Sequence, residues 1–428
     1  MVNTVRPGLR FSTMIHSVVR PLRPLLTVVS LSVLLFVVVV TRPPSAEAIG
    51  STPLTSGSLT MVSTHADGTS GTNPGTTEGA NEVAISDDGS VVAFTSTVPA
   101  EELVTDPLQV GHVTDNNTGS GGPDSGLDVF VYQKLPVLGA IVSLVSSNAS
   151  HTGTGNAPST TPVLAPLGIG LVFRSAATDL VTGSVAASQR HLYAWVPGLS
   201  ALTSVFLIDN KFGTHDACDC IASDPSISMF PTPTVVFDAT ASGTDLAGPG
   251  VAHQGADQVY ANNVLAGTNS LVSVDINGDG VIGGATEPMI AADAPIVVFT
   301  STGDDLVAGF TSSNGSNIWE RNLLTSSTSL ISASQTGDPS GTTGNHDPVI
   351  SSLGNGVAWS SNDPDVSATP FFNAQQSTDH IFYRAILPVK LPTLMVDTGV
   401  TGLLGCDANS NNPGISGDGL SVVFESSC

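Results

Sequence analysis

After residue 48, short apolar runs alternate with polar turns, and one pattern recurs along the rest of the chain. Each occurrence has an approach such as "DPVIS", then a turn, then a β-branched run that ends in an aromatic and small polar residues. The anchoring aromatics are Phe94, Phe173, Phe237, Phe299, Trp359 and Phe424. Their spacings of 79, 64, 62, 60 and 65 residues identify an internal repeat.

Each repeat contains further segments with the pattern of a strand. An acidic-aliphatic step follows each of the first five aromatics, and a second apolar run with an aromatic comes next, as in "LDVFVYQ" and "RHLYAWV". A third run, as in "NSLVSVDI", closes the unit. The steps are Glu102-Leu103, Asp179-Leu180, Asp245-Leu246, Asp305-Leu306 and Asp365-Val366. The pattern predicts four short strands per unit and no amphipathic helix after the N-terminal segment.

Four-stranded units of this size are typical of the blades of a β-propeller. Because a single blade cannot bury both of its faces, neighbouring blades must stack, with the aromatics of the second and third strands between them. We therefore predict an all-β fold, with residues 49–428 forming a single propeller of six blades of about four strands. The sixth unit offers only two strands, while residues 57–68 resemble a fourth strand. We predict that this N-terminal strand closes the ring beside the C-terminal strands.

The phrases "SDDGSVVAFTS", "VVFTSTGDDLV" and "LDVFVYQ" resemble the TolB-type, WD-like β-propeller repeats of secreted and periplasmic bacterial proteins. The resemblance covers nearly all of the chain after residue 48 and implies a scaffold with a central channel. It specifies no catalytic residues, because this fold carries many functions. The chain departs from the pattern in four units that lack the Asp-Gly turn, and in the incomplete sixth unit.

Residues 1–48 have a different composition. Basic residues precede an uncharged run of 16 residues, from Leu25 to Val40, and the segment ends in the small-x-small pattern Ala46-Glu47-Ala48. We predict a secretory signal peptide that is cleaved after Ala48. An uncleaved anchor is the alternative, although a membrane-spanning helix usually needs about 20 apolar residues. Either way, we expect the protein in the periplasm, at the cell surface or outside the cell.

The charge of the chain limits its partners. The first 48 residues contain five of the 12 basic residues and one of the 36 acidic residues, so their removal leaves a net charge of −28. Such a surface repels nucleic acid and anionic membranes. We expect no nucleic-acid partner, and membrane contact only if the N-terminal segment stays uncleaved. The charge favours cations, but the solubility of an exported protein explains it equally well.

The stretch "VDINGDGVIGGATEP" resembles the start of a calcium-binding loop. Asp275, Asn277 and Asp279 occupy the alternating ligand positions of an EF-hand loop, and Val281 stands where a backbone carbonyl binds the ion. Glu287 is one residue beyond the usual bidentate glutamate, and strands rather than helices flank the loop. We predict a calcium loop between two blades that uses these five residues. The alternative is an Asn/Asp/Gly turn without metal.

Two other groups of polar residues have candidate roles. Asp115, Asn117, Asp124 and Asp128 belong to a Gly-rich stretch, which we interpret as a surface insertion rather than a cation site. A polar residue opens the third strand of five units, namely Asp128, His191, Gln258, Asn317 and His380. We expect each of these to hydrogen-bond a neighbouring loop, since its recurrence favours a structural role over metal binding.

The chain has four cysteines, and in an exported protein these favour disulfides. Cys406 and Cys428 flank the last strand pair, which forms a hairpin, so we predict that they bond to each other. Cys218 and Cys220 then either pair locally or remain thiols, and the sequence leaves this open.

No nucleophile elbow, zinc-binding helix motif, phosphate loop or sialidase-type Asp box occurs in the sequence. We therefore expect an exported, non-catalytic propeller, stabilised by calcium, that serves as a binding scaffold for a protein or a glycan. A glycan hydrolase or lyase centred on the channel is one alternative, since paired carboxylates can act as acid and base. A purely structural surface protein is the other.

Overall fold

The computed structural model describes most of the repeats. The described residues are 80–117, 126–135, 139–185, 189–197, 204–241, 245–248, 251–252, 256–309, 315–333, 344–363, 366, 378–398 and 408–427. The predicted signal peptide, the predicted closing strand 57–68, Asp124, Asp365, Cys406 and Cys428 lie outside this part of the chain. Within it, no helix has the length and apolar character that crossing a membrane requires.

The described strands form five four-stranded antiparallel sheets and one two-stranded sheet, each in chain order. The first sheet contains β1 (Ala80–Ile85), β2 (Val91–Ser96), β3 (Asp128–Leu135) and β4 (Gly139–Leu144), and the one-turn helix α3 (Ala100–Leu103) follows β2. The second contains β5 (Ser159–Leu164), β6 (Leu171–Ser175), β7 (His191–Val196) and β8 (Ser204–Leu207). The third contains β9 (Cys220–Ser228), β10 (Thr234–Ala241), β11 (Gln258–Asn263) and β12 (Thr268–Leu271). The fourth contains β13 (Ala285–Ile290), β14 (Ile296–Ser301), β15 (Asn317–Asn322) and β16 (Ser327–Leu330). The fifth contains β17 (Asn345–Ile350), β18 (Gly356–Ser361), β19 (His380–Ala385) and β20 (Leu394–Met395), and the last contains β21 (Ser410–Ile415) and β22 (Val422–Ser426).

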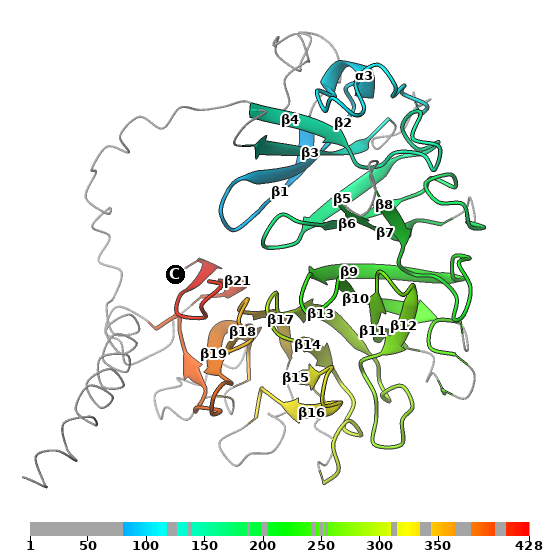
Figure 1. Ribbon diagram of the computed structural model, residues 1–428. Helices are drawn as coiled ribbons and strands as arrows, with labels where there is room; N and C mark the ends of the chain where they lie inside the picture. Colours follow the sequence, from blue (N-terminus) through cyan, green and yellow to red (C-terminus); the bar gives the residue numbers. More distant parts are fainter. Residues whose placement is uncertain are drawn as a thin grey trace, which may run out of the picture.

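The sheets follow one another around the molecule like the blades of a propeller. Figure 1 shows the first strands of the sheets gathered toward the middle, with β4, β12 and β16 at the outside. The first strand of each sheet contacts the first strand of the next, from β1 to β21. The prediction of a nearly all-β, propeller-like fold is therefore confirmed, and six sheets fit the predicted number of blades.

Phe173, Phe237, Phe299 and Trp359 lie in the apolar layers between sheets, whereas Phe94 packs in a cluster with α3 and the segment after it. Phe94, Phe173, Phe237, Phe299 and Trp359 are fully buried, and each lies opposite an aromatic of the third strand of its own sheet. Four of these cross-strand pairs stack with ring centroids 5.7 to 6.0 Å apart, a geometry that adds to the hydrophobic gain of burial. Phe424 is only partly buried, and its sheet has two described strands.

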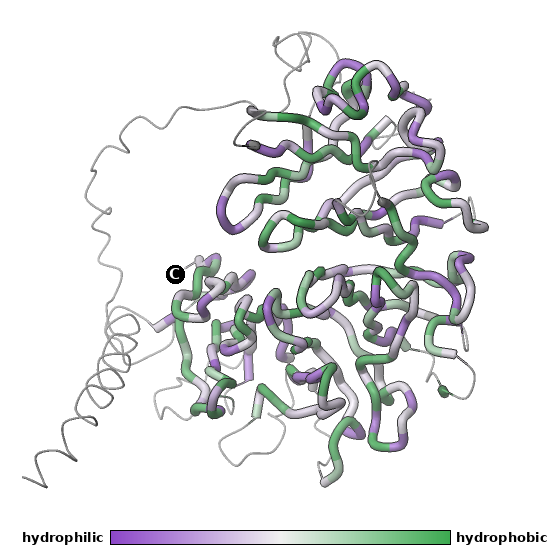
Figure 2. The backbone as a smooth tube through the Cα atoms, viewed as in Figure 1, coloured by the Kyte–Doolittle hydropathy of each residue, from purple (hydrophilic) through white to green (hydrophobic). Residues whose placement is uncertain are grey.

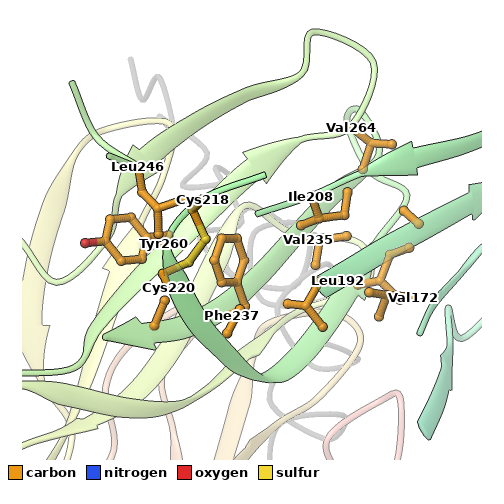
Figure 3. Close-up of a cluster of buried hydrophobic side chains, with 14 of the residues drawn as sticks. Val172, Leu192, Ile208, Cys218, Cys220, Val235, Phe237, Leu246, Tyr260 and Val264 are labelled. Carbon is orange, nitrogen blue, oxygen red and sulfur yellow. A yellow bond between two sulfur atoms is a disulfide. The ribbon is translucent and has the colours of Figure 1, made fainter. Parts of the chain in front are cut away.

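Hydrophobic residues run along the strands, and the turns contain both hydrophilic and hydrophobic residues, such as the exposed Leu324 (Figure 2). Between the second and third sheets, the core also contains a disulfide that joins Cys218 to Cys220. Figure 3 shows this disulfide beside Phe237, Tyr260 and Leu246. Both cysteines are buried, so the question left open by the sequence is answered by a local pair.

Truncation of a layer aromatic should destabilise the fold strongly. We expect Phe237→Ala to lower the free energy of unfolding by about 3–5 kcal/mol, because it removes a fully buried ring and leaves a cavity. Urea denaturation followed by circular dichroism measures the change. Phe424→Ala is the matched control and should cost clearly less, since its ring is partly exposed. Equal losses for the two variants would show that the interleaved layers do not dominate stability.

Candidate functional site

The first strand of each sheet, which lies toward the middle of the molecule, carries a β-bulge at the same place. The bulged residue has a left-handed backbone conformation. The residues are Glu82 (φ 42°), Thr161 (φ 50°), Asp224 (φ 43°), Glu287 (φ 55°), Asp347 (φ 53°) and Asn412 (φ 52°). We call these six residues the inner ring. A positive φ is uncommon outside glycine, and its recurrence in six strands marks a position that the fold holds in place.

The residue type at the next position explains the bulge. A proline follows the ring residue in all sheets except the first, where Val83 stands. Proline has no N–H to give to a sheet, so within sheets it is confined to edges and bulges. The ring residue is therefore displaced from regular pairing, and each of the six has a polar side chain. Sequence analysis missed this ring, although the dipeptide with proline is visible in the repeated phrase.

The two glutamates of the ring link neighbouring sheets. Glu82 Oε2 accepts a hydrogen bond from the backbone N–H of Thr161 at 2.7 Å. Glu287 Oε2 accepts one from the backbone N–H of Asp347 at 2.9 Å and another from Thr300 Oγ1 at 2.8 Å. These are charge-assisted bonds, which are stronger than neutral ones.

Aspartates gather around the ring in the third sheet. Asp238 on β10 is buried and accepts a hydrogen bond from Ser223 Oγ at 2.9 Å. Burial first, and then the nearby Asp224 and Asp257, raise the pKa of Asp238 to about 6. The Asp257 carboxylate also accepts a hydrogen bond from Thr240. The charges of Asp224 and Asp257 therefore act on the buried Asp238, while Asp224 itself is exposed.

A cavity of about 440 Å³ lies between the third and fourth sheets, next to Asp257. Hydroxyl groups and one carboxylate dominate its lining, with Thr240, Asp257, Thr286, Thr300 and Ser316 among the residues. Thr300 links the cavity to Glu287 of the ring. The cavity thus offers hydrogen-bond partners and negative charge, which suit a polar or cationic ligand.

His346 supplies a positive charge next to the ring in the fifth sheet. Its Nδ1 lies 2.9 Å from Asp347 Oδ2, and its Nε2 lies 3.5 Å from Asp379 Oδ1. The hydrogen bond with Asp347 is the main cause that raises the pKa of His346 to about 9. The same contact lowers the pKa of Asp347. At neutral pH a protonated imidazole is therefore held between two carboxylates.

The polar residue that opens each third strand is hydrogen-bonded as expected. Its partner stands just beyond the fourth strand of the same sheet. The pairs are Asp128 with Ser146 (2.9 Å), His191 with Asp209 (2.8 Å), Gln258 with Ser273 (2.7 Å), Asn317 with Ser332 (2.9 Å) and His380 with Asp397 (2.9 Å). A histidine is matched by an aspartate, and the other three by a serine. These groups are buried, and the pairing gives each of them a hydrogen-bond partner, although His191 Nε2 has none among the described residues.

His191, Asp209 and Cys218 form a possible metal site. One ligand atom from each lies within 4.8 Å of the others, and all three residues are buried. Cys218 Sγ is bonded to Cys220, however, and a metal needs the thiolate. The equivalent residues of the fifth sheet, His380 and Asp397, also form a hydrogen bond with each other. While Cys218 is in the disulfide, His191 and Asp209 form a structural hydrogen-bonded pair. The three residues could bind a metal only after reduction of the disulfide.

The predicted calcium loop is the hairpin between β12 and β13. Asp275 Oδ1 accepts hydrogen bonds from the backbone N–H groups of Asn277 (2.7 Å) and Asp279 (2.8 Å), so these three residues are brought together. The Val281 carbonyl accepts one from Gln258 at 3.0 Å. Glu287 instead directs its carboxylate to Thr300 and Asp347, as described above.

Residues 118–125, the centre of the predicted surface insertion, lie outside the described part of the chain, so the insertion stays a prediction. Asn117 and Asp128 are buried, and Asn117 Nδ2 donates to Asp128 Oδ1 at 3.2 Å. The backbone N–H of Asn117 also donates to Asp115 Oδ1 at 3.0 Å. The hydrogen bonds to two carboxylates hold Asn117 inside the protein, which the glycine content of the stretch did not indicate.

The fold and the inner ring define a propeller-like all-β protein with an acidic inner surface. No protein-family model matches the chain, and no curated protein matches its sequence. Similar solved structures include a TolB-type protein from Agrobacterium tumefaciens, with 13% identity and a TM-score of 0.36, over 82% of this chain and 91% of that one. Another is oligogalacturonate lyase from Vibrio parahaemolyticus, with 10% identity and a TM-score of 0.41, over 81% and 79%. A prolyl endopeptidase has 10% identity and a TM-score of 0.39, over 82% of this chain and 42% of its own. Likeness at this level concerns architecture and carries no activity to this chain.

The His346 contacts should make stability depend on pH. We expect wild type to be more stable than His346→Gln below about pH 6.5, the ordinary pKa of histidine, because the charged ring then gains from Asp347 and Asp379. The advantage should fade as pH rises from there through about 9, where His346 loses its proton. It should also fade in acid, once Asp347 is protonated below its ordinary pKa of 3.8.

Melting temperatures of the two proteins across this range test the prediction. His112→Gln is a matched control, because no described ion pair involves His112. A constant difference between wild type and His346→Gln at every pH would contradict it.

Proposed function

We propose that the chain is an exported, non-catalytic binding protein, and that its inner ring receives a positively charged segment of a partner protein. The observation that carries the proposal is the inner ring with its flanking carboxylates. Four of its six residues are acidic, and Asp238 and Asp257 add to Asp224 in the third sheet. A cation bound there relieves the mutual repulsion of these carboxylates, so binding gains free energy that an uncharged ligand does not.

His346 supports the same choice of ligand. This residue shows how a cation is accommodated next to the inner ring. Its two imidazole nitrogens lie close to Asp347 and Asp379. Among the described residues, no Lys, Arg or His forms an ion pair with Asp224, Asp238 or Asp257. The carboxylates of the third sheet therefore have no described counterpart of His346, the cation that lies between Asp347 and Asp379 in the fifth sheet.

Removal of the ring charges should weaken the binding of a basic peptide. We expect the variant with Asp224→Asn, Glu287→Gln and Asp347→Asn to bind a fluorescein-labelled oligoarginine peptide about tenfold or more weakly than wild type, since each lost charge removes attraction to the cationic peptide. Fluorescence anisotropy at low and at high salt measures the affinity.

The control variant also removes three negative charges, but from turns at the other end of the sheets. Asp87→Asn, Asp88→Asn and Asp418→Asn lie in turns between first and second strands, at the end away from the ring. This variant should bind the peptide like wild type. If both triple variants lose affinity equally, the binding reflects only the net charge of the protein, and the ring is not the site.

A glycan hydrolase or lyase is the second candidate, and Asp238 favours it. A carboxyl group with a pKa of about 6, close to two other carboxylates of which Asp257 lines the hydroxyl-rich cavity, has the properties of a general acid. Under the binding proposal, purified wild type should release no products from a panel of polysaccharides. Turnover that varies with pH around 6 and disappears in Asp238→Asn, with the fold intact, would replace the binding proposal by this one.

Further proposals concern the frame of the protein. Calcium at Asp275, Asn277 and Asp279 would fasten the hairpin between the third and fourth sheets, and the neighbouring Asp305 adds negative charge there. In support, backbone N–H groups of Ile276 and Ile282 donate hydrogen bonds to Asp305 across the sheet boundary.

Cleavage after Ala48, ring closure by residues 57–68 and a Cys406–Cys428 bond remain predictions from the sequence.

A further inference from the structure

Asp128 differs from the residues at the same position in the other sheets. The equivalents are two histidines matched by aspartates and two neutral amides matched by serines. Each of those pairs joins a donor to an acceptor, and none of them places a carboxyl group opposite a hydroxyl. Asp128 is 2% exposed, and its partner in the repeat is the Ser146 hydroxyl. An isolated buried carboxylate is costly unless a charge of the opposite sign accompanies it or the group takes up a proton.

A second carboxylate lies close to Asp128. Asn117 connects the two, because its backbone N–H donates to Asp115 Oδ1 and its side-chain Nδ2 donates to Asp128 Oδ1. A third carboxylate, Glu101, accepts a hydrogen bond from the backbone N–H of Asp115 at 2.9 Å. In the described part of the chain, no Lys, Arg or His forms an ion pair with Asp115 or Asp128.

An independent observation points to a ligand at this place. The Asn117 side chain is 7% exposed, and its Oδ1 is buried without a hydrogen-bond partner among the described residues. A buried carbonyl oxygen without a donor is unfavourable, and most such groups in folded proteins are satisfied. The oxygen belongs to the carboxamide that contacts Asp128, so the unsatisfied acceptor is next to the uncompensated carboxylate.

We propose that Asp115, Asn117 and Asp128 bind a calcium ion. All the side-chain groups they offer to a cation are oxygens, which calcium prefers, and no sulfur or imidazole ligand accompanies them. Asp115 and Asn117 have the same spacing as Asp275 and Asn277 in the hairpin of the third sheet. The ion satisfies Asn117 Oδ1 and compensates both carboxylates, while Glu101 adds negative charge nearby.

The position of the site gives the ion a structural task. Residues 97–127 form the long connection from β2 to β3, and Asp115 and Asn117 lie within it. Asn116 between them is tied to Thr154, since its backbone N–H donates to Thr154 Oγ1 at 2.8 Å and its Nδ2 to the Thr154 carbonyl at 3.0 Å. Calcium therefore fastens this connection to the start of β3 and to the hairpin that follows β4.

Calcium counting separates this site from the loop at Asp275. Wild type, Asp115→Asn, Asp275→Asn and the double variant are each dialysed against calcium chloride, and the bound metal per chain is measured. If both sites bind, Asp115→Asn and Asp275→Asn each lose one ion and the double variant loses both. Melting temperatures in calcium and in chelator should follow the same order, because binding to the native state alone raises stability.

Asp128→Asn is a second test of the same site. The fourth sheet already has an asparagine paired with a serine at this position, so the variant should fold. We expect it to lose the same ion as Asp115→Asn and to weaken calcium binding there at least tenfold. Overturning results are wild-type calcium content in Asp115→Asn, or an unchanged calcium response in Asp128→Asn, which would show a neutral carboxyl group instead of a ligand. Loss of calcium in Asp275→Asn alone would keep the hairpin proposal and reject this one.

Discussion

The architecture depends on one repeated hydrogen bond, between the polar residue that opens each third strand and the residue just beyond the fourth. The third strand enters a buried layer, where an unsatisfied polar group costs about 1–3 kcal/mol. Because the partner stands beyond the fourth strand, the bond fixes how the chain leaves the sheet. In the third sheet, Ser273 also accepts the backbone N–H of Val259 at 3.0 Å, which locks the two strand ends together.

The segment that follows the fourth strand also positions the next sheet. The hairpin after the fourth strand donates backbone N–H groups to the acidic-aliphatic step of the following sheet, as Ala149 does to the Asp179 carbonyl (2.7 Å) and Phe212 to the Asp245 carbonyl (2.6 Å). The aliphatic member of each step, such as Leu180 or Leu246, is buried in the layer between sheets. The recurring step in the sequence therefore marks where one sheet docks against the previous one.

The sequence predicted the parts of the fold that depend on apolar side chains. Aromatics such as Phe173 and Trp359 recur because stacked sheets need large groups between them, and that need is visible without coordinates. The inner ring was not predicted, because a bulge is defined by the register between two strands rather than by composition. Glu287 shows the difference. Its distance in sequence from Asp275 indicated a calcium ligand, whereas the bulge in β13 directs it toward Asp347 of the fifth sheet. The burial of Asn117 likewise follows from partners that are remote in the chain.

The two glutamates of the inner ring have a consequence for how such a protein can change. Each reaches the backbone of the next sheet, and aspartate is one methylene shorter. Among the described contacts, Asp224 and Asp347 make no such bond from the same position. Side-chain length thus decides which copies of this repeat position also join two sheets. A protein built from copies of one unit can in this way change the remaining copies one sheet at a time, while the glutamates continue to hold neighbouring sheets together.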